Sequence, residues 1–259
     1  MIFEGRASIG VAMLVFGIVF LWKVYAARHG KLPEIRRLPA LDAIDEAVGR
    51  ATELGKPIHQ TLGSGSITSS AASPMILAGI SVSRYVARKA AEMDTSLIVT
   101  VAAAETYSVA EEVVRTAYIE AGKPDAFDPS VVRFLSPAQF AYTTAAIGIM
   151  TREQVAANIM IGYFAAESLI LAETGNSLGA IQIAGTAVMP QIPFFVVACD
   201  YCLIGEEVYA VSAYLDREPE TLGTIAGQDV AKAMAAVLIV IGSIAVTLGS
   251  TFLVDLLAK

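Results

Sequence analysis

Residues 57–74 read PIHQTLGSGSITSSAASP, and this stretch decides the fold class. Its first part, Pro57–Leu62, is a predicted strand because it is short and ends at a glycine. A loop of small residues follows. Ser73 and Pro74 then have the residue types of a helix start, with serine as N-cap and proline at the first helical position. A strand that leads through a loop into a helix is the unit from which α/β domains are built.

The same alternation of strand-like and helix-like segments continues on both sides of this stretch. Ser108 and Ser136 each begin a capping-box pattern, which indicates two further helix starts. The other predicted strands are Leu97–Val101, Val131–Leu135, Asn158–Phe164, Ala180–Gly185 and Phe194–Ala198. The predicted helices are Leu41–Leu54, Ser73–Met93, Ser108–Gly122, Ser136–Met150, Ala165–Thr174 and Glu206–Tyr214. Mostly apolar strands favour an α/β fold with a mostly parallel sheet and covering helices, in a Rossmann-like layering.

Two charge-free runs, Ala7–Trp22 and Ala233–Val254, lie at the two ends of the chain. The first run extends to about 21 residues, through Ala27, because Lys23 can reach the headgroups. Each span is then long enough to cross a hydrocarbon core of roughly 30 Å as a helix. A cleaved signal peptide is the alternative for the first run, and a buried core helix for the second. The predicted organisation is a transmembrane helix (1–27), a basic juxtamembrane linker (28–40), a cytoplasmic α/β domain (41–216), a connector (217–232) and a second transmembrane helix (233–255).

Basic residues predict the orientation of these two spans. Arg6 is the one base on the outer flank of the first run. The inner flank carries five bases, which are Lys23, Arg28, Lys31, Arg36 and Arg37. We therefore expect a protein of the inner (plasma) membrane, with the domain in the cytoplasm and both termini outside. The spacing of Gly10 and Gly17, and of Gly242 and Gly249, indicates small-residue stripes for close helix packing.

The most informative feature of the domain is a gap in charge. No Lys or Arg occurs between Arg152 and Arg217, although the whole chain has a net charge of −7. Charge is depleted in the cores of protein interfaces, so this segment is a candidate surface for self-association. The candidate interface residues are Ile161, Tyr163, Gln182, Gln191 and Phe194. The alternative is that the segment forms the central strands of the sheet. The acidic balance disfavours nucleic acid as a partner.

The loop residues Gly63, Ser64, Gly65 and Ser66 are candidates for binding a small ligand or nucleotide through main-chain N–H groups. They lack the Walker lysine and the full G-x-G-x-x-G pattern. Asp200, which follows the predicted strand Phe194–Ala198, is a further candidate because ligands of open α/β sheets bind at strand carboxyl ends.

The spacing of Cys199 and Cys202 matches redox motifs and half of a zinc site. The chain has two cysteines and two histidines, His29 and His59, which is too few further ligands for a convincing zinc site. We therefore expect no metal, no cofactor and no catalytic residue. A pair of buried thiols is the simpler interpretation. A non-enzymatic role is favoured, since the chain also lacks a G-x-S-x-G nucleophile elbow.

Six phrases together resemble a prokaryotic family of membrane-anchored proteins that is grouped under a domain of unknown function with transmembrane helices at both ends. They are LPALDAIDEAVG (38–49), AEEVV (110–114), GKPDAFD (122–128), AIQIAG (180–185), QIPFF (191–195) and LIGEE (203–207). The resemblance covers the linker, the domain and the start of the second span. It supports this layout and implies no activity, cofactor or catalytic residue.

The leading hypothesis from the sequence is a membrane-anchored scaffold. Its cytoplasmic domains would associate through the charge-poor segment into a large homo-oligomer, with a ring as the closed form. The partners expected are other copies of the chain and the lipid bilayer. The alternative is a membrane-tethered protein that binds a small ligand or nucleotide, with enzymatic activity left open, at Gly63–Ser66 and Asp200.

Overall fold

The structure is a computed structural model that describes residues 7–30, 36–216 and 219–249. Residues 37–215 form one compact unit, the α/β domain. The described parts of residues 1–36 and 216–259 form a second unit, the helical hairpin. The two ends of the chain therefore belong together, and the domain is inserted between them.

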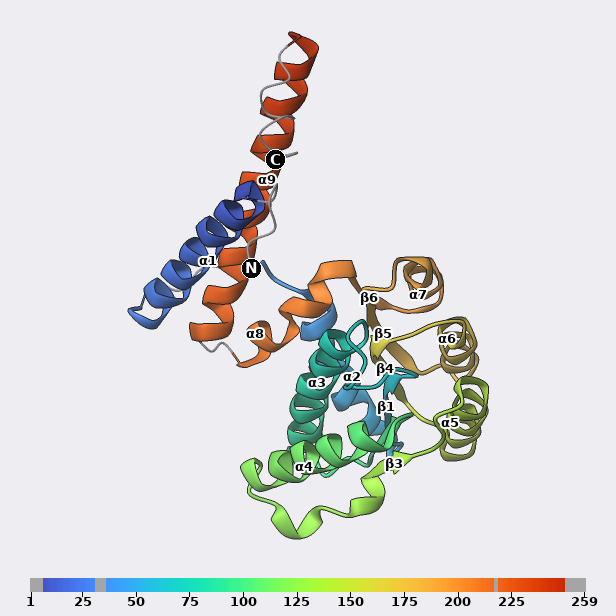
Figure 1. Ribbon diagram of the computed structural model, residues 1–259. Coiled ribbons are helices and arrows are strands. Elements are labelled where there is room, and N and C mark those ends of the chain that lie inside the picture. Colours follow the sequence, from blue (N-terminus) through green and yellow to red (C-terminus); the bar gives the residue numbers. More distant parts are fainter. Residues whose placement is uncertain (1–6, 31–35, 217–218, 250–259) are drawn as a thin grey trace. The chain divides into compact units, whose positions relative to one another are not determined.

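The described strands of the α/β domain form one parallel sheet, in the order β3-β2-β1-β4-β5-β6 (Figure 1). The strands are β1 (Ile58–Gly63), β2 (Leu97–Val101), β3 (Val132–Phe134), β4 (Ala157–Tyr163), β5 (Ile181–Thr186) and β6 (Tyr201–Ile204). From β1 the chain builds outward to β3, returns to the middle of the sheet at β4 and builds outward again to β6. The predicted α/β class and parallel sheet are confirmed.

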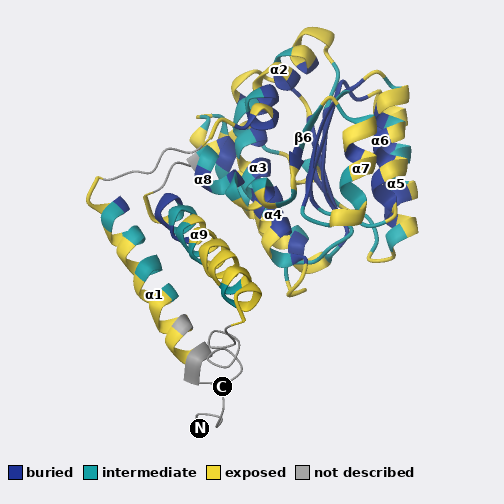
Figure 2. Ribbon diagram, turned by 90° about the horizontal axis from the view of Figure 1, so that it is seen from above, coloured by how far each residue is buried: buried dark blue, intermediate teal, exposed yellow. Residues whose placement is uncertain are grey.

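Helices cover both faces of this sheet, as Figure 2 shows. One layer consists of α2 (Pro39–Leu54), α3 (Ser73–Glu92) and α4 (Ala104–Glu120), and the other of α5 (Gln139–Glu153), α6 (Glu167–Ser177) and α7 (Ile192–Ala198). The remaining helical elements of the domain are α8 (Val211–Asp216) and the 3₁₀ turns η1 (Pro124–Ala126), η2 (Pro129–Val131), η3 (Met189–Gln191) and η4 (Gly205–Ala210).

The larger part of the core lies between the sheet and the α2–α4 layer. Ile58, Leu62 and Ile159 point from the strands into it and are fully or almost fully buried. Each such side chain contributes roughly 1.5–3 kcal/mol of hydrophobic stabilisation. Helix α3 lies very close to the sheet at Gly79, where a Cβ atom would be 2.3 Å from the carbonyl oxygen of Ile161. A glycine is therefore required there.

The prediction of a strand at Phe194–Ala198 was wrong. These residues belong to α7, in which Pro193 occupies the first turn and Phe195 is the buried residue. The last strand is β6, which pairs with β5 from Tyr201 onward. A short apolar run is compatible both with a strand and with a helix that buries one face. Here the segment that pairs with β5 is Tyr201–Ile204, and Phe194–Ala198 lies in the helix before it.

The two predicted capping boxes were also misplaced. Ser108 lies inside α4, which begins four residues earlier at Ala104. Ser136 accepts a hydrogen bond from the main-chain N–H of Ala138 (3.1 Å) ahead of α5, which begins at Gln139. A serine followed by an acid or amide three positions later also occurs within and before helices, so the pattern alone did not fix the first residue.

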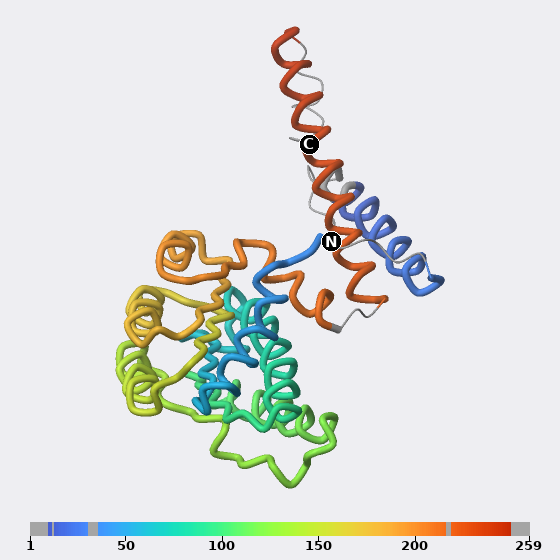
Figure 3. Tube along the Cα trace, turned by 180° about the vertical axis from the view of Figure 1, so that it is seen from behind, coloured from blue at the N-terminus to red at the C-terminus, as the bar shows by residue number. Residues whose placement is uncertain are grey.

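The helical hairpin pairs α1 (Ala7–Arg28) with α9 (Pro219–Thr247), which lie side by side in Figures 1 and 3. Gly223 and Gly227 of α9 permit the contact. A Cβ atom at Gly223 would be 2.7 Å from the Cα of Val24, and one at Gly227 would be 2.9 Å from the ring of Phe20. This spacing is the small-x-x-x-small pattern of close helix packing.

The predicted glycine stripes of the hairpin do not take part in this contact. A Cβ atom at Gly10, Gly17, Gly242 or Gly249 would meet no other atom within 4 Å. Among the described helices, α9 is long and apolar enough to cross a membrane by length and composition. Parts of the predicted linker and of both termini lie outside the described residues.

Candidate functional site

The sequence order of the strands reverses between β1 and β4. In open α/β sheets, ligands bind at the carboxyl ends of the strands at such a switch point. The predicted loop Gly63–Ser66 leaves β1 at this position, where Gly63 is in register with Tyr163 of β4. The loop therefore lies at the carboxyl edge of the sheet, beside the switch point.

Both loop glycines are explained by contacts within the protein. Gly63 has a φ of +80°, and a Cβ atom there would be 1.9 Å from the carbonyl oxygen of Tyr163. At Gly65 it would be 2.8 Å from the Cβ of the same tyrosine. The main-chain N–H of Ser64 donates to the Tyr163 carbonyl (3.1 Å). The loop is thus packed onto the end of β4.

A buried carboxylate, Glu167, holds the next part of the loop. Ser64 Oγ donates to Glu167 Oε1 (2.5 Å), and Gln139 Nε2 donates to Glu167 Oε2 (2.5 Å). Glu167 is the first residue of α6 and is fully buried. A carboxylate is favoured at a helix N-terminus by the helix dipole. Glu167 therefore ties the β1–α3 loop to the starts of α5 and α6.

The hydroxyls of Ser66 and Thr68 both donate to Glu105 in the first turn of α4. The hydrogen bond from Ser66 is the main cause that lowers the pKa of Glu105, so this carboxylate is ionised at neutral pH. The carboxylates of Glu105 and Glu167 thus already accept the hydrogen bonds that the hydroxyls of this loop could donate to a phosphate. The charge of Glu105 would repel an anion, and ligand binding by Gly63, Ser64, Gly65 and Ser66 stays a prediction.

Asp200 lies at the opposite edge of the sheet. It precedes β6, where its Oδ2 accepts a hydrogen bond from the main-chain N–H of Gln182 (2.8 Å) and its own N–H donates to the Gln182 carbonyl (3.1 Å). The structure therefore does not bring Asp200 together with Gly63–Ser66. Asp200 lies just before the strand β6, at its amino end, whereas the sequence analysis expected it at the carboxyl end of a strand at Phe194–Ala198.

A chain of buried polar side chains crosses four strands beneath the α5–α7 layer, and no local sequence pattern indicates that these residues meet. Gln182 Nε2 donates to two main-chain carbonyls, at 2.8 and 2.7 Å, which leaves its Oε1 to accept from Asn158 Nδ2 (3.1 Å). Asn158 Oδ1 then faces His59 Nδ1 at 2.8 Å, so that nitrogen carries the proton. His59 Nε2 is left to accept from the hydroxyl of Thr100 (3.0 Å).

His59 is neutral in this chain of hydrogen bonds. Burial lowers its pKa from 6.5 to about 4, although the hydrogen bond to Asn158 opposes the shift. The chain continues through Thr100 to the hydroxyl of Tyr142, which also bonds Thr61. All these side chains are buried. They form a structural network with no exposed reactive atom.

Cys199 and Cys202 are both half-buried and close to one another. Hydrogen bonding to Cys202, together with burial, raises the pKa of Cys199, while the same contact lowers the pKa of Cys202. Cys199 follows the carboxyl end of α7, whereas reactive thiols are favoured at helix amino ends. Within the described residues, no group of three or more His, Cys, Asp or Glu side chains could hold a metal ion.

The predicted interface residues differ in accessibility. Ile161 and Gln182 have essentially no exposed surface in the subunit, and Tyr163 and Gln191 are half-buried. Phe194 is 39% exposed on α7. An interface of the folded domain can therefore use Phe194 and its surroundings but not Ile161 or Gln182.

The family described as "Domain of unknown function (DUF6754)" matches residues 1–257. No curated protein and no solved structure matches the chain.

Proposed function

Since the chain belongs to the DUF6754 family, whose description assigns no activity, we propose its function from the chemistry of its surface. The proposal is a membrane-anchored scaffold protein whose α/β domain assembles into a large homo-oligomer, with a ring as the closed form. The observation that carries it is the contrast between the two helical layers of the domain.

The outer surface of the α2–α4 layer is charged and internally paired. Arg84 of α3 forms an ion pair with Glu120 of α4 (2.6 Å), and Lys89 of α3 with Asp45 of α2 (3.5 Å). Such pairs contribute little stability, about 0–1 kcal/mol each, but they keep a surface soluble. This face also exposes Leu77 (52%) and Ile119 (51%), but among charged side chains of both signs.

The outer surface of the α6–α7 half is apolar. From residue 154 to residue 199, Glu173 is the one exposed charged side chain, because Glu167 is buried. Exposed apolar side chains gather on α6, η3 and α7 instead: Leu169 and Ile170 (40% each), Met189 (72%), Phe194 (39%), Val196 (51%) and Val197 (87%). We call these six residues the apolar face.

An apolar surface of this kind marks an interaction site in a soluble domain. A second copy of the chain is the occupant we propose, because subunits held in one membrane plane share an orientation and meet repeatedly. Contacts between different surfaces of identical subunits close into rings when the rotation closes. The absence of Lys and Arg from the face supports a protein partner over an anionic membrane surface, which attracts basic residues.

Val196→Glu is expected to break the assembly, because it places a charge on the apolar face. Association should weaken at least about tenfold, corresponding to about 1.4 kcal/mol. Ile119→Glu on α4 is the matched control, since both side chains are 51% exposed in the subunit. The measurement is particle mass by mass photometry of detergent-purified protein. A monomeric wild-type protein, or equal masses for wild type and Val196→Glu, would refute the proposal.

We further propose that α1 and α9 both cross the inner membrane. The contacts of Val24 with Gly223 and of Phe20 with Gly227 make the pair antiparallel. Continued along both helices at 1.5 Å per residue, this register sets Asp229 and Lys232 beside the apolar part of α1. These two charges, 3.9 Å apart, partly neutralise one another. An isolated charge at mid-membrane costs about 2.5–3.5 kcal/mol on insertion scales, a cost that this pairing reduces.

The orientation follows from the bases after the first span. In a Cys199→Ser/Cys202→Ser background, Asp125→Cys on the exposed α4–β3 connection is expected to react with a membrane-impermeant maleimide in inside-out vesicles but not in intact cells. Glu4→Cys, on the predicted outer side, serves as the control and should show the reverse. Labelling of Asp125→Cys in intact cells would contradict a cytoplasmic domain.

A further inference from the structure

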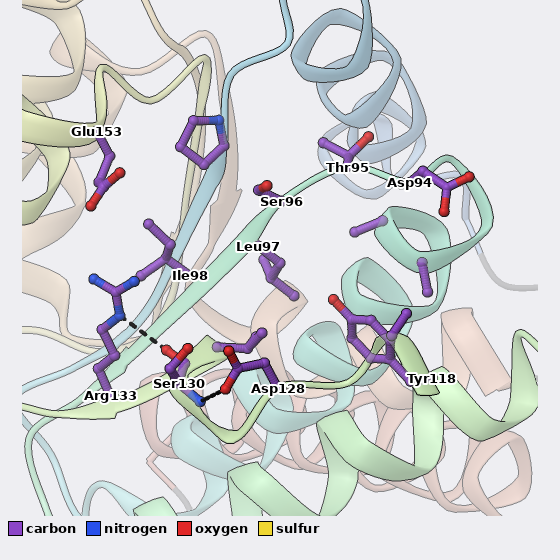
Figure 4. A pocket seen from close by; sticks show the side chains of 15 residues that line it. Asp94, Thr95, Ser96, Leu97, Ile98, Tyr118, Asp128, Ser130, Arg133 and Glu153 are labelled. Atoms are coloured by element: carbon purple, nitrogen blue, oxygen red, sulfur yellow. Dashed lines mark hydrogen bonds between the residues drawn. The ribbon is translucent and has the colours of Figure 1, made fainter. Parts of the chain in front are cut away.

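A cavity of about 440 Å³ opens at the amino-terminal edge of the sheet, away from the switch point (Figure 4). The start of β2, the end of α4, the η1–η2 segment and the end of α5 contribute its walls. Pockets for small ligands have volumes of about 300–1,000 Å³. The cavity is therefore large enough for a small metabolite.

Two hydrogen-bond donors in its wall are unused. Arg133 donates through Nε to the carbonyl oxygen of Ser130 (3.0 Å), and neither of its terminal nitrogens has a partner among the described residues. Tyr118 is 5% exposed, yet its hydroxyl forms no hydrogen bond within the described part of the chain. Figure 4 shows this hydroxyl directed toward the cavity. Both side chains therefore present donors to the cavity that no protein acceptor among the described residues uses, and these can donate to a ligand.

The acceptors of the wall differ in their availability. Asp94 forms an ion pair with Lys123 (2.7 Å), and Asp128 accepts the main-chain N–H of Ser130 (2.8 Å). Glu153, at the end of α5, has no such partner among the described residues. In Figure 4 its carboxylate and the guanidinium of Arg133 lie on the same side of the cavity. They form no ion pair within 4 Å, so each charge is available to a ligand.

We propose that this cavity binds a small zwitterionic metabolite, of which a free amino acid is the simplest member. The carboxylate of the ligand would lie against the terminal nitrogens of Arg133, where a bidentate contact is possible. Its ammonium group would pair with Glu153, and the hydroxyl of Tyr118 would donate to a further oxygen. A simple anion fits less well, because Asp94, Asp128 and Glu153 all carry negative charge at the rim. This binding site is independent of the proposed self-association.

The test is isothermal titration calorimetry of the detergent-purified protein with each of the twenty proteinogenic amino acids in turn. We expect saturable binding of at least one of them. Arg133→Gln and Glu153→Gln should each weaken it about tenfold or more, since each removes a charged hydrogen bond. Arg115→Gln, which removes an exposed arginine from the Glu112 pair on α4, should leave the affinity unchanged. N-acetylation removes the ammonium charge of the ligand. The N-acetylated amino acid should therefore bind the wild-type protein and Glu153→Gln with the same affinity.

Tyr118→Phe distinguishes a loss of ligand affinity from a loss of stability. The hydroxyl has no partner in the subunit, so its removal should leave the unfolding midpoint unchanged or slightly raised while it weakens ligand binding. The proposal is overturned if no amino acid binds saturably to the wild-type protein. It is equally overturned if Arg133→Gln and Arg115→Gln bind with the same affinity.

Discussion

Gln182→Leu is expected to lower the free energy of unfolding of the α/β domain by about 3 kcal/mol or more. The side-chain amide of Gln182 bonds three groups, which are Asn158 Nδ2 and the carbonyl oxygens of Ala172 and Ala198. Leucine would leave all three without these partners, two of them in buried positions and the Ala198 carbonyl in a partly buried one. Each unsatisfied buried group costs about 1–3 kcal/mol, and loss of the Asn158 contact weakens the hold on His59 as well. Urea unfolding followed by circular dichroism would measure the change.

Gln60→Leu is the matched control for this prediction. Gln60 is equally buried, on β1, but its Nε2 makes one long hydrogen bond to the carbonyl of Gly79 (3.3 Å). Its Oε1 has no partner among the described residues. Leucine removes that unsatisfied oxygen, so we expect a change of about 1 kcal/mol or less. Equal destabilisation by the two substitutions would show that the network contributes nothing beyond the volume of its side chains.

Acid is expected to destabilise the domain through His59. Its pKa is about 4 in the folded protein and 6.5 in the unfolded chain. The unfolded state therefore binds a proton in this range that the folded state does not. Stability attributable to His59 is fully present above pH 6.5 and is lost as the pH falls toward 4. The shift corresponds to about 3 kcal/mol between these limits.

The measurement is the difference in unfolding free energy between wild type and His59→Gln across this pH range. Glutamine can donate and accept within the network but does not titrate, so the variant should lack about 3 kcal/mol of the acid sensitivity. Carboxylates that titrate in both proteins cancel in the difference. His29→Gln alters an exposed histidine of the hairpin and should keep the wild-type profile. Parallel profiles for wild type and His59→Gln would disprove a buried neutral His59.

The candidate site was predictable in part. The loop Gly63–Ser66 could be located at the carboxyl end of a strand because its glycines and serines interrupt the apolar pattern. The sequence analysis did not identify Glu167 as the partner of this loop, although Glu167 and Glu173 are the two charged residues between positions 154 and 199. The two meet only because β1 and β4 are neighbours in the sheet, and Ser64 and Glu167 are 103 positions apart.

The difference between the charged and the apolar helical layers could also be predicted only in part from the sequence. The missing Lys and Arg residues indicated an unusual segment but could not show which of its residues are buried. The strands β4 and β5 took Ile161 and Gln182 into the sheet, whereas α6 and α7 left Val196 and Val197 exposed. Burial of a residue depends on the layer that covers it, and local sequence does not contain that information.

By itself, the sequence determined the α/β class, most of the strands and the charge-free runs at both ends, because these follow from local patterns of apolar, small and charged residues. The tertiary structure alone decided the strand order, the switch point and the position of Asp200 at the opposite edge. It also decided the buried chain from Gln182 to His59, in which Asn158 bonds a histidine 99 positions away. Such contacts depend on which strands pair, and pairing is set by how the whole core is buried.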